Sequence, residues 1–314
     1  MNPFKILSLK GGGLRGVGTV QILKRIEALT GKRIYELFDL IAGTSTGGLI
    51  ACGVSYLYTL DTIMSVYTKR GSEIFPKTGI LNAEKDLFLP KYSPAGLSQV
   101  LTDLFGKRTI QQAHTQVILT AFDMNGNKPV YFKSRDDYNP TFYDICRATT
   151  AAPSYFPSYV FEYPKGTIIN CIDGGIFDND PSLAALAEYS KHHDYYRPET
   201  AGDKDINYGD VTVLTVGTGH YSGTESAPTI INKGEIYWAQ NIMDAAMRGV
   251  EVSTDYKITE MMVEGNYLKL DFPISEYKYC DMTGSSKEQM DFLTAAADKA
   301  YMDNIDSVKK FFKL

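Results

Sequence analysis

Cysteine is scarce in this sequence. Cys52, Cys146, Cys171 and Cys280 are the four among 314 residues, and no pair of them has the spacing of metal ligands. A small secreted domain held by disulfides needs a much denser cysteine framework, and a thiolate zinc site needs closely paired cysteines. Two of the four lie inside apolar stretches of the chain. We therefore expect buried, reduced thiols and no metal site.

The chain also lacks an excess of positive charge. Its formal net charge is −5 and its pI is about 5.5. Proteins that bind nucleic acids present basic faces to the phosphates, so this balance argues against a nucleic-acid partner. It argues equally against attachment to anionic membranes by charge alone.

The N-terminal residues, Met1 to Lys5, contain no apolar core of a secretory signal. The uncharged run 40–60 is long enough to span a bilayer, but it carries five serine and threonine residues and several glycines. A buried strand, a tight turn and a buried helix explain this run better than a membrane helix does. We therefore predict a soluble, cytoplasmic protein, and peripheral association with membranes stays open.

The sequence does contain the material of a large α/β unit. Hydrophobic residues make up 44% and charged residues 22%, which is the balance of a globular protein with ample core. Short apolar runs alternate with helical patterns, which predicts a three-layer α/β/α fold with a mostly parallel central sheet. No repeat or Pro/Ser-rich linker divides the chain. We predict a single domain over 1–314, with a catalytic core at about 4–190 and the strands and helices of 191–314 packed on the same unit.

The apolar runs also predict individual elements. Asp180 is expected to cap a helix that has Pro181 at its first position. The C-terminal helix is expected over 287–312, and another over 237–248. Strands are expected at 4–9, 40–42, 117–122, 130–132, 167–172 and 211–216, with further helices at 17–29 and from the second run to Tyr56. Functional sites of such sheets lie beyond the carboxyl ends of the strands, and three motifs occur there.

The first motif is a glycine-rich turn directly after the first strand. Its glycines let the backbone come close to a ligand, and its N–H groups at a helix N-terminus suit an anion. We interpret it as an anion cradle, and a simple tight turn between strand and helix is the alternative. The motif consists of Gly11, Gly12, Gly13, Leu14, Arg15 and Gly16.

The second motif is Gly43-Thr44-Ser45-Thr46-Gly47, directly after the second apolar run. Gly-x-Ser-x-Gly is typical of a nucleophile elbow, a strained strand-to-helix turn that lifts the serine into the open. The flanking glycines, Gly43 and Gly47, are needed because strand and helix crowd together there. The pattern alone is weak, since about one chain in ten of this composition would contain it by chance. Its position between a strand and a helix favours the elbow.

The third motif is Asp173-Gly174-Gly175, which closes the strand predicted at 167–172. A carboxylate at a strand end, followed by flexible glycines, can be held and oriented as a base. By itself this triplet is more often an ordinary turn. Together, however, the three motifs place an anion cradle, a nucleophile and a base at strand ends of one sheet, and acyl transfer needs those three parts.

In this order and on such strands, GGGLRG, GTSTG and DGG resemble the patatin-like phospholipase family of serine acyl-hydrolases. The similarity covers most of residues 4–220 and continues weakly into the C-terminal helix. One departure is Lys10, where many members carry Asp before the glycines. Further stretches that resemble the family are 147–157, Asn179-Asp180-Pro181 and Gly217-Thr218-Gly219.

The resemblance implies a Ser45–Asp173 dyad that hydrolyses membrane or micellar lipid esters without a metal ion or a cofactor. Ser45 would attack the ester carbonyl and Asp173 would take its proton. The N–H groups of residues 11–14 would stabilise the oxyanion, while Arg15 would brace that loop or contact a substrate phosphate. Some members of the family are switched on by a small ligand or a protein, so such an activator stays open, as do the oligomeric state and the lipid head group.

Three other interpretations compete with the dyad. A Ser-His-Asp hydrolase would use Ser45, Asp173 and His220, although that fold usually has several strands before its elbow. Gly11-x-Gly13-x-x-Gly16 formally satisfies the dinucleotide fingerprint, but Glu36 and Asp39 precede the second run instead of ending it. A catalytically silent, ligand-binding member of the family is the third, and the intact motifs disfavour it.

Two segments bear on access to lipid. The stretch 74–92 interleaves apolar residues with Lys and Pro and is a candidate lid, with packing onto the core as the alternative. The C-terminal run, ending at Leu314, could lie at an interface, but packing on the domain is the better interpretation.

Overall fold

The strand β1 (Phe4–Leu9) lies near the middle of the central sheet. In the computed structural model, which describes residues 2–76, 89–200, 206–222 and 235–314, β1 pairs in parallel with β2 (Leu40–Thr44) on one side and β7 (Val211–Val216) on the other. The remaining strands of this sheet are β3 (Gln116–Asp123), β4 (Lys128–Lys133), β5 (Tyr159–Glu162), β6 (Ile168–Asp173) and β9 (Tyr267–Leu270). The strand order is β5-β6-β3-β2-β1-β7-β9, with β4 also paired to β3.

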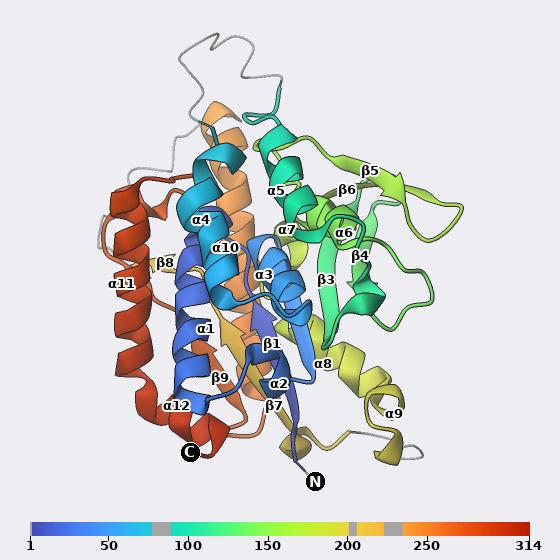
Figure 1. The fold of residues 1–314 in the computed structure, drawn as a ribbon, viewed down its shortest axis with the longest axis vertical. Helices are drawn as coiled ribbons and strands as arrows, with labels where there is room; N and C mark the ends of the chain where they lie inside the picture. Colours follow the sequence, from blue (N-terminus) through green and yellow to red (C-terminus); the bar gives the residue numbers. More distant parts are fainter. Residues whose placement is uncertain (1, 77–88, 201–205, 223–234) are drawn as a thin grey trace.

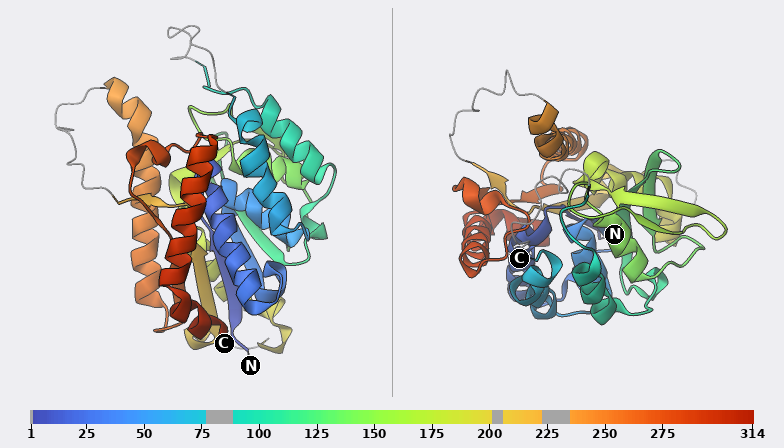
Figure 2. Two further views of the ribbon diagram at one scale, coloured as in Figure 1. Left: turned by 60° about the vertical axis from the view of Figure 1, so that its left-hand side comes forward. Right: turned by 90° about the horizontal axis from the view of Figure 1, so that it is seen from above.

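Side chains of β1 alternate between two hydrophobic cores, one on each face of the sheet. Leu7 and Leu9 pack into the first core, and Phe4 and Ile6 into the second. Figures 1 and 2 show the sheet between the two groups of helices that cover these cores. The first core is covered by α1 (Gly16–Thr30), α2 (Ile34–Leu37), α3 (Thr46–Ser55), α4 (Leu60–Ile74), α5 (Ala95–Phe105), α6 (Phe142–Thr149), α11 (Lys287–Asp303) and α12 (Ile305–Phe312). The second is covered by α8 (Ser182–Lys191), α9 (His193–Tyr196) and α10 (Glu235–Met261).

The three-layer α/β/α prediction is therefore confirmed, and the sheet is mixed in detail. The five strands β3, β2, β1, β7 and β9 run parallel to their neighbours within that series. At one end of the sheet, β4 and β6 pair antiparallel with β3, and β5 pairs antiparallel with β6. A separate pair of short strands is formed by β8 (His220–Tyr221) and β10 (Pro273–Ile274).

Three helix predictions need correction. The helix expected over 237–248 continues to Met261 as α10. The helix expected over 287–312 is interrupted at Asn304, whose backbone (φ −110°, ψ 11°) leaves the helical region. The helix expected from Pro181 begins at Ser182 instead, because Pro181 has ψ 21° and stands just before the helix. The Asp180 carboxylate does accept the Ser182 N–H (3.2 Å), but it also accepts the Ser8 hydroxyl (2.9 Å) and so joins β1 to this segment.

The C-terminal residues pack on the domain, as the better of the two interpretations predicted. In α12, Val308 and Phe311 are buried in the first core. The ring of Phe312 stands edge-on to that of Phe38, with 6.0 Å between centroids. The apolar face of this helix is therefore covered by the chain itself.

All four cysteines are free. Cys52, Cys146 and Cys171 are buried as expected, whereas Cys280 is partly exposed. Within the described ranges, no helix combines the length and the hydropathy that a membrane span requires.

Candidate active site

Ser45 stands at a sharp turn between β2 and α3. Its backbone has φ 55° and ψ −121°, a strained conformation for a residue with a side chain. The turn is also crowded, since a Cβ added to Gly47 would lie 2.1 Å from the Leu9 carbonyl oxygen, and one added to Gly43 would lie 2.5 Å from that of Gly47. The Ser45 N–H donates to Thr149 Oγ1 at 2.8 Å. This geometry is that of a nucleophile elbow.

The pairing register of β3 brings the ends of two strands together. Along one side, β3 pairs with β2 as far as Thr120, which lies opposite Thr44. The next residue, Ala121, lies opposite Asp173, the last residue of β6. Because β4 occupies the other side of β3, the ends of β2 and β6 must meet on this side. Ser45 follows the end of β2 directly, so this register places the serine beside the aspartate although β6 is antiparallel.

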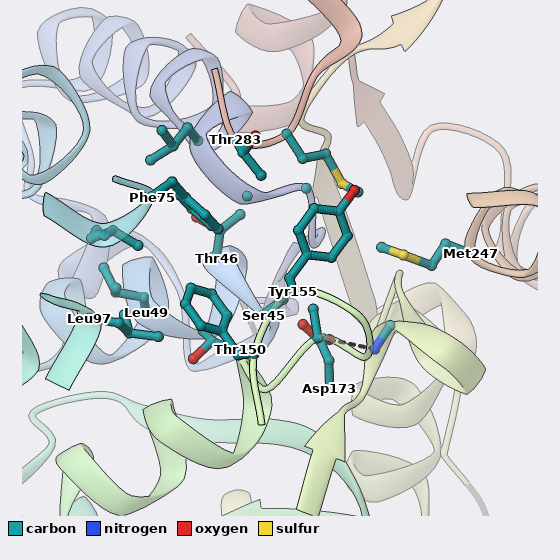
Figure 3. Close-up of a pocket in the computed structure, with 18 of the residues that line it drawn as sticks. Ser45, Thr46, Leu49, Phe75, Leu97, Thr150, Tyr155, Asp173, Met247 and Thr283 are labelled. Carbon is teal, nitrogen blue, oxygen red and sulfur yellow. Dashed lines mark hydrogen bonds between the residues drawn. The ribbon is translucent and has the colours of Figure 1, made fainter. Parts of the chain in front are cut away.

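The Asp173 carboxylate is buried, with 3% of the residue exposed. Its Oδ1 accepts the Gly175 N–H at 2.8 Å, drawn as a dashed line in Figure 3. Burial raises the pKa of Asp173 to about 6, while hydrogen bonding by the Ser45 side chain and by the Gly175 N–H acts in the opposite direction. Gly174 and Gly175 lead into the short helix α7 (Gly175–Asp178). Asp173 is thus a carboxylate that changes charge close to neutral pH.

The glycine-rich loop lies between β1 and α1, and its four N–H groups are not equivalent. Gly11 N–H donates to the Asn179 carbonyl at 3.2 Å, and Leu14 N–H donates to the Met282 carbonyl at 2.7 Å. Gly12 and Gly13 N–H have no acceptor among the described residues. Of the four N–H groups predicted to form the anion cradle, two therefore have an acceptor within the described part of the chain and two do not.

Side chains on both flanks of this loop hold it. Thr218 Oγ1 donates to the Gly11 carbonyl at 2.8 Å. Arg15 Nε donates to the Gly12 carbonyl at 3.4 Å, a contact compatible with bracing of the loop. Gly16 then begins α1.

Lys10 is fully buried beneath the loop, and its ammonium lies 3.5 Å from the Asp180 carboxylate, which is also fully buried. Burial acts to lower the pKa of Lys10, but the carboxylates of Asp180, Glu251 and Asp271 raise it overall. Position 10, where many members of the family carry Asp, thus holds a lysine that is paired with a buried carboxylate.

A cavity of about 80 Å³, partly open to solvent, is bordered by Ser45. Its walls are mostly apolar. Figure 3 shows Leu49, Leu97 and Phe75 on one side of Ser45 and Met247, from α10, on the other. The candidate lid at 74–92 contributes Ile74 and Phe75 to the cavity, and its residues 77–88 lie outside the described part of the chain.

His220 does not join this site. It lies in β8, is absent from the described lining of the cavity, and places its Nδ1 3.5 Å from the Asp271 carboxylate. The carboxylates weighed for dinucleotide binding are also engaged elsewhere, since Glu36 accepts the Arg33 N–H and Asp39 accepts the Lys5 N–H, both at 2.8 Å.

A sequence profile described as Patatin-like phospholipase matches residues 7–186. The chain belongs to this family. Patatin-like protein 4 of Arabidopsis thaliana is 31% identical over 305 residues, which covers 86% of this chain and 76% of that protein. A protein of Solanum tuberosum named Probable inactive patatin-3-Kuras 1 is 28% identical over 297 residues, covering 84% of this chain and 77% of that one.

Among solved structures, VipD from Legionella pneumophila matches with a TM-score of 0.51 and 11% sequence identity, over 98% of this chain and 67% of that one. This likeness concerns the fold alone. Membership of the patatin-like family assigns the chain a lipid acyl-hydrolase function, and the family mechanism is a Ser–Asp dyad.

Several residues at the patatin-like site were not singled out by sequence reasoning. Thr149 and Thr218 lie within stretches that resemble the family, and this resemblance was the one feature of the sequence that could have pointed to them. Met247, Met282 and Thr283 come from the last quarter of the chain and line the same cavity. No motif marks them, because only long-range packing brings them to the site: Met282 lies against Gly13, and Met247 lies against Gly175. Over the described ranges, no group of His, Cys, Asp or Glu side chains is arranged to hold a metal ion.

Proposed function

We propose that this chain hydrolyses carboxylic esters of lipids through an acyl-enzyme on Ser45, with Asp173 as the general base. The observation that carries the proposal is the register of β3, which places the serine elbow and a buried carboxylate end to end. The Ser45 side chain also acts to lower the pKa of Asp173, and this closeness supports direct proton transfer between the two.

In the first half of the reaction, Asp173 removes the hydroxyl proton of Ser45 while Oγ forms a bond to the ester carbonyl carbon. The tetrahedral intermediate then collapses, the C–O bond to the leaving alcohol breaks, and the proton passes from Asp173 to that alcohol. Water attacks the acyl-enzyme in the second half, with Asp173 again as the base. The fatty acid leaves and Ser45 regains its proton.

Negative charge develops on the carbonyl oxygen in both halves. The Gly12 and Gly13 N–H groups support the proposal because they are the donors of the loop without an acceptor among the described residues. A carboxylate is a weak base for a serine hydroxyl, so these donors must supply much of the rate. Losing one such donor typically lowers turnover by ~10²–10³-fold.

The apolar cavity supports an acyl chain as the group that is bound. Leu49, Leu97 and Phe75 form a wall on one side of Ser45, where a hydrocarbon chain would replace water without leaving polar groups unpaired. The substrate would then be drawn from a membrane or a micelle, with its ester carbonyl at Ser45.

The test combines fluorophosphonate labelling with hydrolysis of a short-chain ester and of a phospholipid. The wild-type chain is compared with Ser45→Ala, Asp173→Asn and His220→Ala. We expect Ser45→Ala to abolish labelling and both Ser45→Ala and Asp173→Asn to lower kcat by at least ~10³-fold. His220→Ala should stay near wild type, since His220 contacts Asp271 and not the cavity.

Other outcomes would decide against the dyad. Equal loss in His220→Ala would require a histidine triad. A wild-type chain that is folded but neither labels nor hydrolyses any of these esters would favour a non-catalytic member of the family, of the kind that the name of the potato relative indicates.

A further inference from the structure

We propose that Gln289 is a positioning residue for the oxyanion-binding loop, acting through the turn formed by residues 281–284. This inference rests on the proposed function, because it concerns the two free N–H groups of that loop. The turn and Gln289 both lie outside the stretch matched by the family, 7–186. The carbonyl of Met282 in this turn is what fixes Leu14.

The contact between turn and loop is close and directional. Met282 O accepts the Leu14 N–H at 2.7 Å. At the neighbouring Gly13, whose φ is 60°, an added Cβ would lie 2.3 Å from the same carbonyl oxygen. Only a glycine allows both this left-handed conformation and this approach. The direction of the free Gly13 N–H is therefore set by where the Met282 carbonyl stands.

The turn is ordered by its own side chains. The Asp281 carboxylate accepts the Thr283 N–H at 2.9 Å and the Thr283 hydroxyl at 2.8 Å. Thr283 lines the cavity and its Oγ1 also lies 3.2 Å from the Tyr92 hydroxyl. An Asx-type turn of this kind fixes the local backbone, but it does not fix the turn relative to the rest of the protein.

Gln289 supplies that attachment. Its side chain, in the first turn of α11, is buried with 4% exposed. Its Nε2 donates to the Asp281 carbonyl at 2.7 Å and to the Tyr279 carbonyl at 3.3 Å. Gly284 lies against the same amide, since a Cβ there would be 1.9 Å from Gln289 Oε1. One buried amide thus hydrogen-bonds to the chain before Met282 and packs against Gly284 after it.

The helix that carries Gln289 is in turn fixed to the helix that follows the loop. Gln21 Nε2 and Arg25, both in α1, donate to the Asp298 carboxylate of α11 at 2.7 Å. Arg25 alone makes two of these bonds, at 2.7 and 2.8 Å, so α1 and α11 stay joined without the Gln21 contact. Loss of the Gln289 donor leaves α1 in place but releases Met282.

The experiment replaces Gln289 with methionine, which keeps the length of the side chain and removes the donor. Gln21→Met is the matched control: it makes the same exchange on the same pair of helices, α1 and α11, but does not touch the turn. Both variants are assayed for kcat and KM on a soluble short-chain ester. They are also assayed for inhibition by a trifluoromethyl ketone, because the adduct formed when Ser45 Oγ adds to its carbonyl carbon carries an oxyanion.

We expect Gln289→Met to lower kcat by ~10–100-fold with KM within a factor of ~3, because misplaced donors affect the transition state more than the ground state. Its affinity for the ketone should fall by the same factor as kcat/KM. Gln21→Met should keep wild-type kinetics. A Gln289→Met enzyme with wild-type kcat, or equal losses in both variants, would overturn the proposal.

Two further comparisons keep the result decisive. If Gln289→Met does not fold, Gln289→Asn retains the amide but shortens it by one methylene, and a smaller loss of kcat in the same direction is expected. Ser45→Ala separates this inference from the proposed function. An active wild type with an inactive Ser45→Ala and an unaffected Gln289→Met refutes the positioning role alone, whereas an inactive wild type refutes the proposed function.

Discussion

At the scale of single residues, the proposed chemistry depends on how far burial shifts the pKa of one carboxylate. Asp173 is enclosed, and burial raises its pKa to about 6 against the opposing effects of Ser45 and Gly175. A stronger base takes the serine proton more readily, provided that it is still ionised at the working pH. A carboxylate of this pKa meets both conditions near neutral pH without a histidine.

The pH dependence of kcat/KM follows from that shift. Asp173 must be ionised to act as a base, so activity is lost as the pH falls through the pKa of the folded, free enzyme. We expect kcat/KM on a soluble ester to rise to a plateau with a midpoint near pH 6. An unshifted aspartate would place this midpoint near 4.

The control for this profile is Asp178→Asn. Burial and the nearby Asp180 raise the pKa of Asp178 to about 7, so its titration could overlap that of Asp173. The Asp178→Asn enzyme should retain the midpoint near 6. A midpoint that moves in this variant would assign the titration to Asp178 and contradict the role given to Asp173.

At the scale of elements, the segment after α7 is attached to the end of β1 by one charged contact. Lys10 follows β1, Asp180 precedes α8, and both side chains are fully buried at 3.5 Å from each other. Ser8 in β1 donates to the same carboxylate at 2.9 Å. The Lys10–Asp180 ion pair therefore fixes the glycine loop relative to the segment that follows Asp173. Removing one partner leaves a buried charge unpaired, which destabilises the fold.

A double-mutant cycle on Lys10 and Asp180 tests this attachment. Lys10→Met or Asp180→Asn alone leaves one buried charge without its partner, and each should lower the free energy of unfolding by about 3–5 kcal/mol. The double variant removes both charges, so its loss should be smaller than the sum of the single losses by at least about 1 kcal/mol. Urea unfolding measures all four proteins, and additive losses would show that the pair is not coupled.

At the scale of the whole molecule, residues beyond 191 complete the sheet and the site together. β1 is flanked on one side by β7, which in turn pairs with β9. The same part of the chain supplies Met247, Met282 and Thr283 to the cavity. The part that carries the three motifs therefore lacks, by itself, one neighbour of its central strand and one wall of its site.

A fragment that ends at Lys191 should consequently not reach the native fold. Without β7, β1 becomes an edge strand, and without α11 the buried face of α1 is exposed to water. We expect the fragment to lack the near-UV circular dichroism of the full chain and to resist fluorophosphonate labelling. A folded fragment that labels on Ser45 would instead establish a separate catalytic domain.

The sequence by itself determined the fold class and the strands that carry the motifs, and it predicted which residues stand at the centre of the site. A strained elbow is predicted by Gly43, Ser45 and Gly47, because only small residues fit where a strand and a helix cross closely. Asp173 was predicted as the base only from the three motifs taken together and from the family resemblance, since Asp-Gly-Gly alone is more often a turn. Such features depend on local backbone geometry, and local geometry is written in short patterns of residues.

The tertiary structure decided how these parts meet. The antiparallel direction of β6 depends on strand register. Contacts between residues more than 160 positions apart occupy the N–H groups of Gly11 and Leu14 and pair Lys10 with Asp180. The same holds for Met282 at the glycine loop. Sequence patterns cannot specify such contacts, because they follow from the packing of many side chains at once.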